Sequence, residues 1–240
     1  PETGLGSVPV TVIDAGRDWW DGAGFVSFRE DNRARWPDWQ QAPGQSFAED
    51  DAALLIVGLA PGLRGANRTS RPFTGDFAGQ LLYPTLVQFG FADGNYDESA
   101  EDGLALVGCR ITNAVRCVPP QNKPVGAEIN ACRPFLADEI AGMAKLRIIL
   151  ALGTVSHGSI LRTLGLRAAE YPFSHCAFHT LPDGMVLADS YQCSRSNTHP
   201  ARLTEAMFHE LFRGTPSRVR PGPAPSDPAR TAHLSSGAFP

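Results

Sequence analysis

Short, continuous apolar runs separated by segments with helical periodicity constrain the fold of this chain more than any other feature. Leu54–Leu59 (LLIVGL) and Arg147–Leu152 (RIILAL) have the uninterrupted apolar pattern of parallel strands buried on both faces. Two further strands are predicted at Leu106–Val115 and Met185–Ser190. Helices are predicted at residues 77–89, 125–143, 154–164 and 202–212, with a shorter one near 24–35. Strands that alternate with helices predict an α/β fold, a three-layer α/β/α sandwich with a central, mainly parallel four-stranded sheet.

The chain has 240 residues, which is long enough for one domain with a full hydrophobic core. We expect this domain to span residues 25–213, after an irregular N-terminal segment at residues 1–24. Residues 214–240 are rich in Pro, Ser, Ala and Gly, a composition that predicts a disordered tail. The sequence shows neither an apolar run near the roughly 18 residues of a membrane span nor a secretion signal. We therefore expect a cytoplasmic monomer without a membrane partner.

Ligands of such a sandwich bind in the loops beyond the carboxyl ends of the strands. In this chain those loops are residues 60–76, 116–124, 153–157 and 191–198. The first loop and the residues before it read GLAPGLRGANRTSRPFTGD, from Gly58 to Asp76. Its glycines allow the backbone to approach a ligand closely and to present N–H groups. The loop is not a Walker phosphate loop, because no GK[ST] follows.

The string from Gly58 to Asp76 resembles the first motif of the type 5 uracil-DNA glycosylases, the iron–sulfur-containing bacterial and archaeal branch. Further stretches resemble the same family: ITNAVRCVPPQNKP at 111–124, RIILALG at 147–153, SYQCSRSNT at 190–198 and RLTEAMF at 202–208. The resemblance covers roughly residues 25–212, in the family's order. It implies a DNA-repair glycosylase that flips uracil, or another deaminated base, out of DNA and hydrolyses its N-glycosidic bond.

By this resemblance, Asp76 is the acid that positions or activates the water attacking C1′, and its carboxylate also stabilises positive charge on the sugar. The alternative is that Asp76 only caps the helix that begins at Phe77. Phe73 matches the aromatic residue on which the flipped base stacks, a contact worth about 1–3 kcal/mol. Its alternative role is that of a core residue that holds the loop down.

The resemblance also implies a base-binding surface that includes Gly58 and Ala60. Asn113 and Asn122 are the candidates for reading the amide edge of the base, since an Asn side chain offers a donor and an acceptor together. Asn113 ends a predicted strand, where forming a turn is a competing role. Asn122 lies in a polar loop bounded by prolines.

A net charge of −4 does not exclude a nucleic-acid partner, because the distribution of charge matters more than its sum. Acidic residues gather in Asp93–Asp102 (DGNYDESAED), whereas basic residues, Arg71 and Arg116 among them, lie beside the motif loops. The alternative for each arginine is a solvated surface charge. Contacts to uracil-containing DNA are expected from Arg68, Lys123, Ser194, Arg195 and Asn197.

One departure from the family concerns the last motif, where the family places a His that hydrogen-bonds the uracil O2 as negative charge builds on the leaving base. This chain has Gln192 at that position. A Gln amide donates a neutral hydrogen bond but cannot carry charge, and loss of one well-aimed donor costs about 10²–10³ in rate. We expect a weakened monofunctional glycosylase. The alternatives are a catalytically impaired DNA-binding module of the same fold and, more remotely, an unrelated α/β enzyme with a small phosphate ligand.

The second departure concerns the 4Fe–4S cluster that the family holds with four cysteines. Cys117 and Cys132 match the later pair, but the earlier pair aligns with Trp19 and Gly22. Since such clusters normally need four thiolates, we expect two buried thiols here and no cofactor required for the chemistry. Substitute ligands would have to come from the remaining cysteines: Cys109, Cys176 and Cys193.

Overall fold

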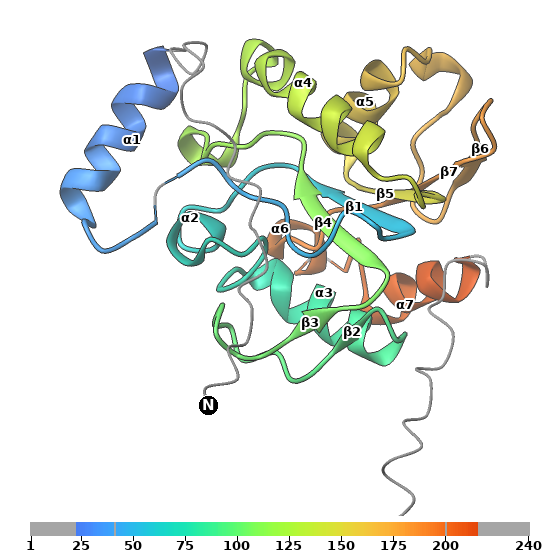
Figure 1. Cartoon of the computed structure of the whole chain (residues 1–240), viewed down its shortest axis with the longest axis horizontal. Helices are drawn as coiled ribbons and strands as arrows, with labels where there is room; N and C mark the ends of the chain where they lie inside the picture. The colour runs from blue at the N-terminus through green and yellow to red at the C-terminus, as the bar shows by residue number, and fades with distance from the viewer. Residues whose placement is uncertain (1–22, 41, 200, 216–240) are drawn as a thin grey trace, which may run out of the picture.

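A five-stranded sheet forms the middle layer of the computed structural model, which describes residues 23–40, 42–199 and 201–215 (Figure 1). Its strands stand in the order β4 (Cys109–Asn113), β1 (Leu54–Gly58), β5 (Ile148–Leu152), β7 (Val186–Ser190) and β6 (Phe178–Thr180). The first four are parallel to one another and are the four strands that the sequence predicts. The predicted number of strands is wrong by one. The missing strand, β6, pairs antiparallel with β7 at the edge, and its three residues carry no apolar run.

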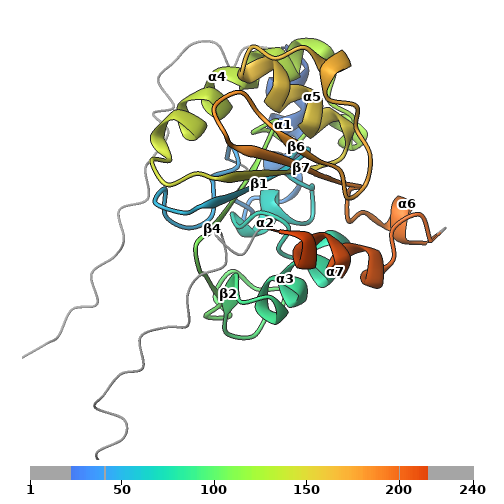
Figure 2. The ribbon, with the colours of Figure 1, turned by 90° about the vertical axis from the view of Figure 1, so that its right-hand side faces the viewer.

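The inner strand β1 requires helices on both faces of the sheet, because all five of its residues are buried. Leu54 and Ile56 belong to one core cluster and Leu55 and Val57 to the other, since successive side chains of a strand point to opposite faces. The helices that cover the first cluster are α3 (Phe77–Gln88) and α7 (Glu205–Gly214), and those over the second are α4 (Gly126–Gly142) and α5 (Thr154–Thr163) (Figure 2). The predicted three-layer sandwich is confirmed.

The remaining elements are mostly too short to show periodicity in the sequence. They are α2 (Ala66–Thr69), β2 (Ala92–Asp93), β3 (Ala105–Leu106), the 3-10 turns η2 (Pro120–Asn122) and η3 (Ala168–Glu170), and α6 (Arg195–Thr198). The longer α1 (Ala23–Arg35) contacts η2 at one side of the molecule (Figure 1). The predicted N-terminal segment and tail lie almost entirely outside the described residues. Within the described ranges, no helix is both long and apolar enough to cross a membrane.

The parallel order of β4, β1, β5 and β7 brings their carboxyl ends to one edge of the sheet. Gly58 pairs with Asn113 at the end of β1, and Leu152 pairs with Ser190 at the end of β5. The segments that lead into the first two loops are also hydrogen-bonded to each other, since the Ala114 N–H donates to the Gly58 carbonyl at 2.9 Å. The four loops predicted to carry the functional site therefore leave the sheet side by side.

Candidate active site

Gly58 is the point at which a ring and an amide converge. A Cβ built on this buried residue would overlap both the tip of the Phe73 ring and Oδ1 of Asn113, closer than real Cβ atoms come to any neighbour. A larger residue here would displace the Phe73 ring or the Asn113 amide. Three predicted base-binding residues thus meet at one point, where the missing side chain of Gly58 leaves room for the Phe73 ring and the Asn113 amide.

Asn113 ends β4 and is only 4% exposed. Its Oδ1 is buried and has no hydrogen-bond partner among the described residues. An unsatisfied buried acceptor costs about 1–3 kcal/mol, and a donor supplied by a ligand would satisfy it. This geometry favours reading of a base edge over the competing role in turn formation.

Phe73 has a left-handed backbone, with φ of +58°, and its side chain is 6% exposed. Its ring belongs to the core cluster beneath α3 while the ring tip reaches Gly58. The structure thus gives Phe73 the packing that a core residue would have, and it also places the ring beside Asn113. A non-glycine residue in this region of backbone space costs about 1–3 kcal/mol, and such strain gathers at ligand sites.

Asp76 occupies the N-cap position of α3, yet its side chain makes no capping hydrogen bond. Its carboxylate lies against Gly62 and Gly65, where an added Cβ would overlap it in either case. Burial in this glycine cradle raises the pKa of Asp76 to about 6, and the positive charge of Arg68 opposes the rise. The carboxylate is thus a base with a pKa close to neutral, and the geometry does not support the alternative that Asp76 only caps the helix.

Two exposed arginines lie near this carboxylate, Arg68 acting on Asp76 itself and Arg195 lying over the ring of the next residue. Arg68 is exposed, and its Nε donates to the Arg64 carbonyl at 2.9 Å. Arg195 is exposed on α6 and holds its guanidinium 5.1 Å from the ring centre of Phe77, the residue after Asp76. Two exposed positive charges at the rim of a carboxylate pocket suit a phosphate backbone.

The loop after β7 carries Gln192, Ser194 and Asn197. Gln192 is half-buried, and its Cβ lies beside Gly153, the first residue after β5. The Asn197 side-chain amide donates to the Gln192 carbonyl at 2.9 Å, while the Ser194 hydroxyl lies 2.9 Å from that of Ser196. Asn197, predicted as a DNA contact, thus also holds the backbone of Gln192 in place.

Other predicted residues do not join this group. Asn122 and Lys123 are exposed at η2, next to α1, and Asn122 has a left-handed backbone with φ of +56°. Ala60 packs with buried cysteines rather than with Phe73 and Asn113. The sequence predicts four base-binding residues besides Phe73. The structure brings Gly58 and Asn113 together, whereas Ala60 and Asn122 lie apart from them.

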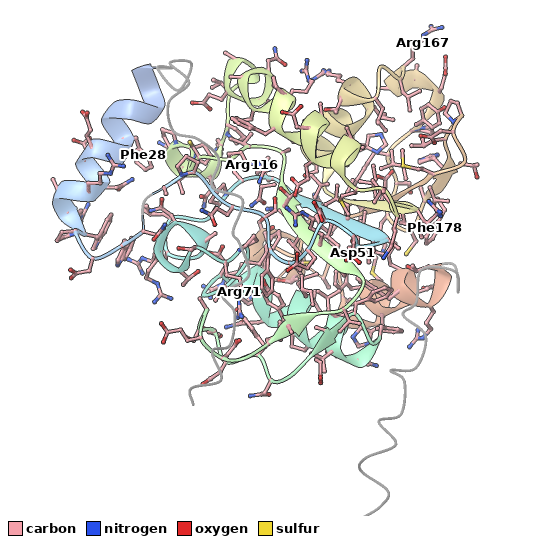
Figure 3. The ribbon with its side chains drawn as sticks, viewed as in Figure 1. Phe28, Asp51, Arg71, Arg116, Arg167 and Phe178 are labelled. Carbon is pink, nitrogen blue, oxygen red and sulfur yellow. The ribbon has the colours of Figure 1, made fainter. Side chains whose placement is uncertain are left out.

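Arg71 and Arg116 are not solvated or DNA-facing charges. The Arg71 side chain is 5% exposed and paired with Asp102, and the Arg116 side chain is 4% exposed and paired with Glu139 (Figure 3). The sequence shows only that the two arginines lie near the motif loops. It does not reveal that their carboxylate partners lie 31 and 23 positions further along the chain.

The cysteines of the described residues fall into separate groups. Cys117 and Cys132 share a small buried group with Val115, and the Arg116 N–H donates to the Cys132 sulfur at 3.4 Å. Burial raises the pKa of the Cys132 thiol. Cys109 and Cys193 belong to the separate core cluster under α3, and the described residues contain no set of three or more metal-ligating side chains. The positions aligned with the earlier pair, Trp19 and Gly22, lie outside the described residues.

Tyr96 supports the first loop but was not among the residues predicted for the site. The Tyr96 hydroxyl contacts the backbone at Phe73 and Gly75 from the connection between β2 and β3. The only signal in the sequence is an aromatic residue within an otherwise acidic and polar run, which carries no period.

Comparison with known proteins gives a consistent picture. Residues 45–214 match the family model described as the uracil DNA glycosylase superfamily. The chain is 42% identical over 176 residues to a type-5 uracil-DNA glycosylase of Thermus thermophilus, a span covering 73% of this chain and 80% of that protein. It is 40% identical over 173 residues to one of Mycobacterium leprae, covering 71% and 76%, and 32% identical over 178 residues to one of Pyrobaculum aerophilum, covering 74% and 76%.

The raised pKa of Asp76 predicts a specific effect of Asp76→Asn on stability. The folded-state pKa of about 6 exceeds the ordinary 3.8, so this group lowers the free energy of unfolding as pH rises from about 4 to 6 and keeps it lowered above that. Two pH units correspond to about 3 kcal/mol. We expect Asp76→Asn to melt higher than the parent at pH 8, by about 5–10 °C, and equally at pH 4. Thermal melts in both buffers check this; a lower melting temperature at pH 8 would restore the capping role.

The cysteine arrangement predicts a colourless protein. We expect purified protein to lack the broad absorbance near 400 nm of iron–sulfur clusters and to contain well under one iron per chain. Iron analysis and an ultraviolet–visible spectrum of protein purified without oxygen provide the measurement. Iron near four per chain would mean that other thiols replace the missing pair.

Proposed function

The chain belongs to the uracil DNA glycosylase superfamily, and from this premise we propose that it is a DNA-repair enzyme that hydrolyses the N-glycosidic bond of uracil in DNA. The observation that carries the proposal is the Asp76 carboxylate, which is held without a capping hydrogen bond in a glycine cradle with a pKa of about 6. It lies three residues after Phe73, whose ring tip meets Asn113 over Gly58. The same site could accept other deaminated bases.

The seat formed by the Phe73 ring and the Asn113 amide beside Gly58 suits a base that has been flipped out of the duplex. In this arrangement the base stacks on the Phe73 ring. The unpartnered Oδ1 of Asn113 is an acceptor for the N3–H of uracil, while the amide nitrogen of the same side chain can donate to O4. Cytosine would present a different edge to this side chain, with an acceptor at N3 and an amino donor at C4, whereas thymine differs from uracil by the methyl group at C5.

The chemical step then depends on Asp76. At neutral pH the carboxylate is mostly ionised, which stabilises the positive charge that builds on the sugar as the bond to N1 breaks. The electron pair of that bond leaves with the base. Water attacks C1′ and its proton passes to Asp76. The base leaves as the uracil anion and takes up a proton from solvent, while Asp76 loses the proton that it accepted, and the DNA is left with an abasic site. The absence of a lysine beside this cradle supports monofunctional hydrolysis, since Lys123 lies exposed at η2 and Lys145 pairs with Asp51 at 2.9 Å.

Gln192 and the rim arginines complete the proposed site. We assign the Gln192 amide to the O2 of the leaving base, where a neutral donor stabilises less charge than the family's His would. Arg68 and Arg195 are assigned to phosphates on either side of the flipped nucleotide, with Ser194 beside them and Lys123 further along the strand. The alternative function, a DNA-binding module with little catalysis, is favoured by one observation, Gln192 itself.

The direct test of the proposed function uses a uracil-containing duplex and the matching thymine duplex as its control. Incubation with protein followed by alkali should cleave the uracil strand alone, and free uracil should appear in equal amount. Tight binding of both duplexes without any cleavage would favour the binding-module alternative.

The role of Asp76 predicts the pH dependence of the reaction. A general base acts only when deprotonated, so the single-turnover rate should rise with pH through an apparent pKa near 6 and level off above 7. Asp76→Asn should lower the rate at pH 8 at least 100-fold and abolish this pH dependence. Rates measured from pH 5 to 8.5 test both points. A variant with parental rates would remove Asp76 from the mechanism.

The role of Gln192 predicts a gain of function. Gln192→His should raise the single-turnover rate at least tenfold, which corresponds to about 1.4 kcal/mol of barrier, with little change in DNA affinity because the effect belongs to the transition state. Asn130→His, on the exposed surface of α4, is the matched control and should leave the rate unchanged. An unchanged or lower rate in Gln192→His would mean that this side chain does not face the leaving base.

A further inference from the structure

The segment that joins the base seat to the catalytic carboxylate is strained. Ser70, Phe73 and Gly75 all have left-handed backbones, with φ of +68°, +58° and +77°. Two of them are not glycine, and each such residue costs about 1–3 kcal/mol unless its surroundings hold it. The position of the Phe73 ring relative to Asp76 therefore depends on whatever fixes this backbone.

A buried ion pair anchors the start of the segment. Arg71 donates two hydrogen bonds of 2.7 Å to Asp102 and a third, from Nε, to the Thr74 hydroxyl at 2.6 Å. Its guanidinium lies 5.2–5.8 Å from the ring centres of Phe47, Tyr83 and Tyr96, a cage of aromatic faces that suits a cation. Arg71 is labelled in Figure 3, between α2 and the β2–β3 hairpin.

Two tyrosine hydroxyls hold the peptide groups that follow. Tyr83 donates to the Pro72 carbonyl. The Tyr96 hydroxyl donates to the Phe73 carbonyl and accepts the Gly75 N–H, each at 3.3 Å. Tyr96 thus bridges the two left-handed residues that stand between the ring of Phe73 and the carboxylate of Asp76.

Gly79 shows how closely Tyr96 packs against this backbone. A Cβ at Gly79 would overlap the Phe73 carbonyl and the Tyr96 hydroxyl. The ring of Tyr96 is itself fixed by stacking on Tyr83, with centroids 4.7 Å apart. No flexible side chain lies in the gap, so the hydroxyl of Tyr96 is held where it contacts the strained backbone.

The support comes from the acidic run of the sequence. Asp102 and Tyr96 both lie in the connection between β2 and β3, and Asp102 also accepts the N–H groups of Asp97 at 3.1 Å and Leu104 at 3.0 Å. Pairing with Arg71 lowers the pKa of Asp102 below its ordinary range. The carboxylate at the end of this run is therefore not a solvated charge but half of the anchor.

We propose that Tyr96 is a positioning residue for excision: its hydroxyl fixes the backbone at Phe73 and Gly75 and so sets the distance between the stacked base and Asp76. This inference rests on the proposed glycosylase function. The Tyr96 hydroxyl bonds to the backbone of Phe73 and Gly75, and it is through this backbone that Tyr96 would act. Because a misplacement of about 1 Å between reacting groups costs up to about 10² in rate, the effect should appear in the chemical step.

Tyr96→Phe tests the proposal because it removes only the hydroxyl and keeps the ring stacked on Tyr83. In single-turnover excision from a uracil duplex, we expect the maximal rate to fall at least tenfold and the half-saturating enzyme concentration to stay within twofold. A merely structural role would lower the active fraction and leave the rate of the active molecules unchanged. Tyr171→Phe, which removes a hydroxyl from the turn after η3, is the matched control and should keep the parental rate.

Gly79→Ala tests the same proposal with a second variant, since its methyl group displaces the contact of the Tyr96 hydroxyl with the Phe73 carbonyl. Alanine also favours the helix more than glycine does. We expect the same loss of maximal rate. Amide exchange at Gly75 gives a readout that needs no activity and should quicken in Tyr96→Phe. Parental maximal rates in both variants would overturn the positioning role while leaving the proposed function standing. A parent protein that excises no uracil would overturn the proposed function, and the positioning role with it.

Discussion

The parallel pairing of β1 with β4 is the constraint on which the site depends. It sets Gly58 opposite Asn113 at the carboxyl edge of the sheet, so the last residues of two neighbouring strands share one small surface. Both faces of β1 are buried, so a slip of the register by one residue would point Leu54 and Ile56 toward the opposite face of the sheet and away from their own core cluster. The hydrophobic core therefore fixes the geometry of the polar site above it.

The loop between Gly58 and Asp76 combines close approach with external support. Glycines at 58, 62 and 65 let side chains lie directly on backbone, and the Phe73 ring, the Asn113 amide and the Asp76 carboxylate use that space. Close packing removes water from the carboxylate and so raises its pKa, which is what a base operating near neutral pH requires. The left-handed backbone of Phe73 is held by Arg71, Tyr83 and Tyr96 rather than by the loop itself. Burial of the Asp76 carboxylate thus lowers the free energy of unfolding, and the ion pair and aromatic cage beneath it offset this loss.

Much of this could be predicted from the sequence. Runs such as LLIVGL and RIILAL reveal buried parallel strands because their pattern is local, and the rule that ligands bind at strand ends then selects the right loops. Asp76 and Phe73 were identified by resemblance to a family, and the structure adds the missing cap bond and the burial that a motif cannot show. Strand β6 was missed because three partly exposed edge residues carry no pattern. The partners of Arg71 and Arg116 and the contact of Tyr96 with Phe73 could not be predicted, since each joins positions more than 20 residues apart without any periodic signal.

The pKa of Asp76 in the free protein tests the central claim most directly, because burial in the glycine cradle is the main cause of its rise and the measurement needs neither DNA nor activity. It can be read from the side-chain carboxyl ¹³C shift of Asp76 in a nuclear magnetic resonance titration from pH 3 to 8, with Asp76→Asn to assign the signal. The expected midpoint is near 6. A midpoint at or below the ordinary 3.8 would mean that Asp76 is solvated or hydrogen-bonded as a cap, and it would contradict the assignment of this carboxylate as the buried base of the site.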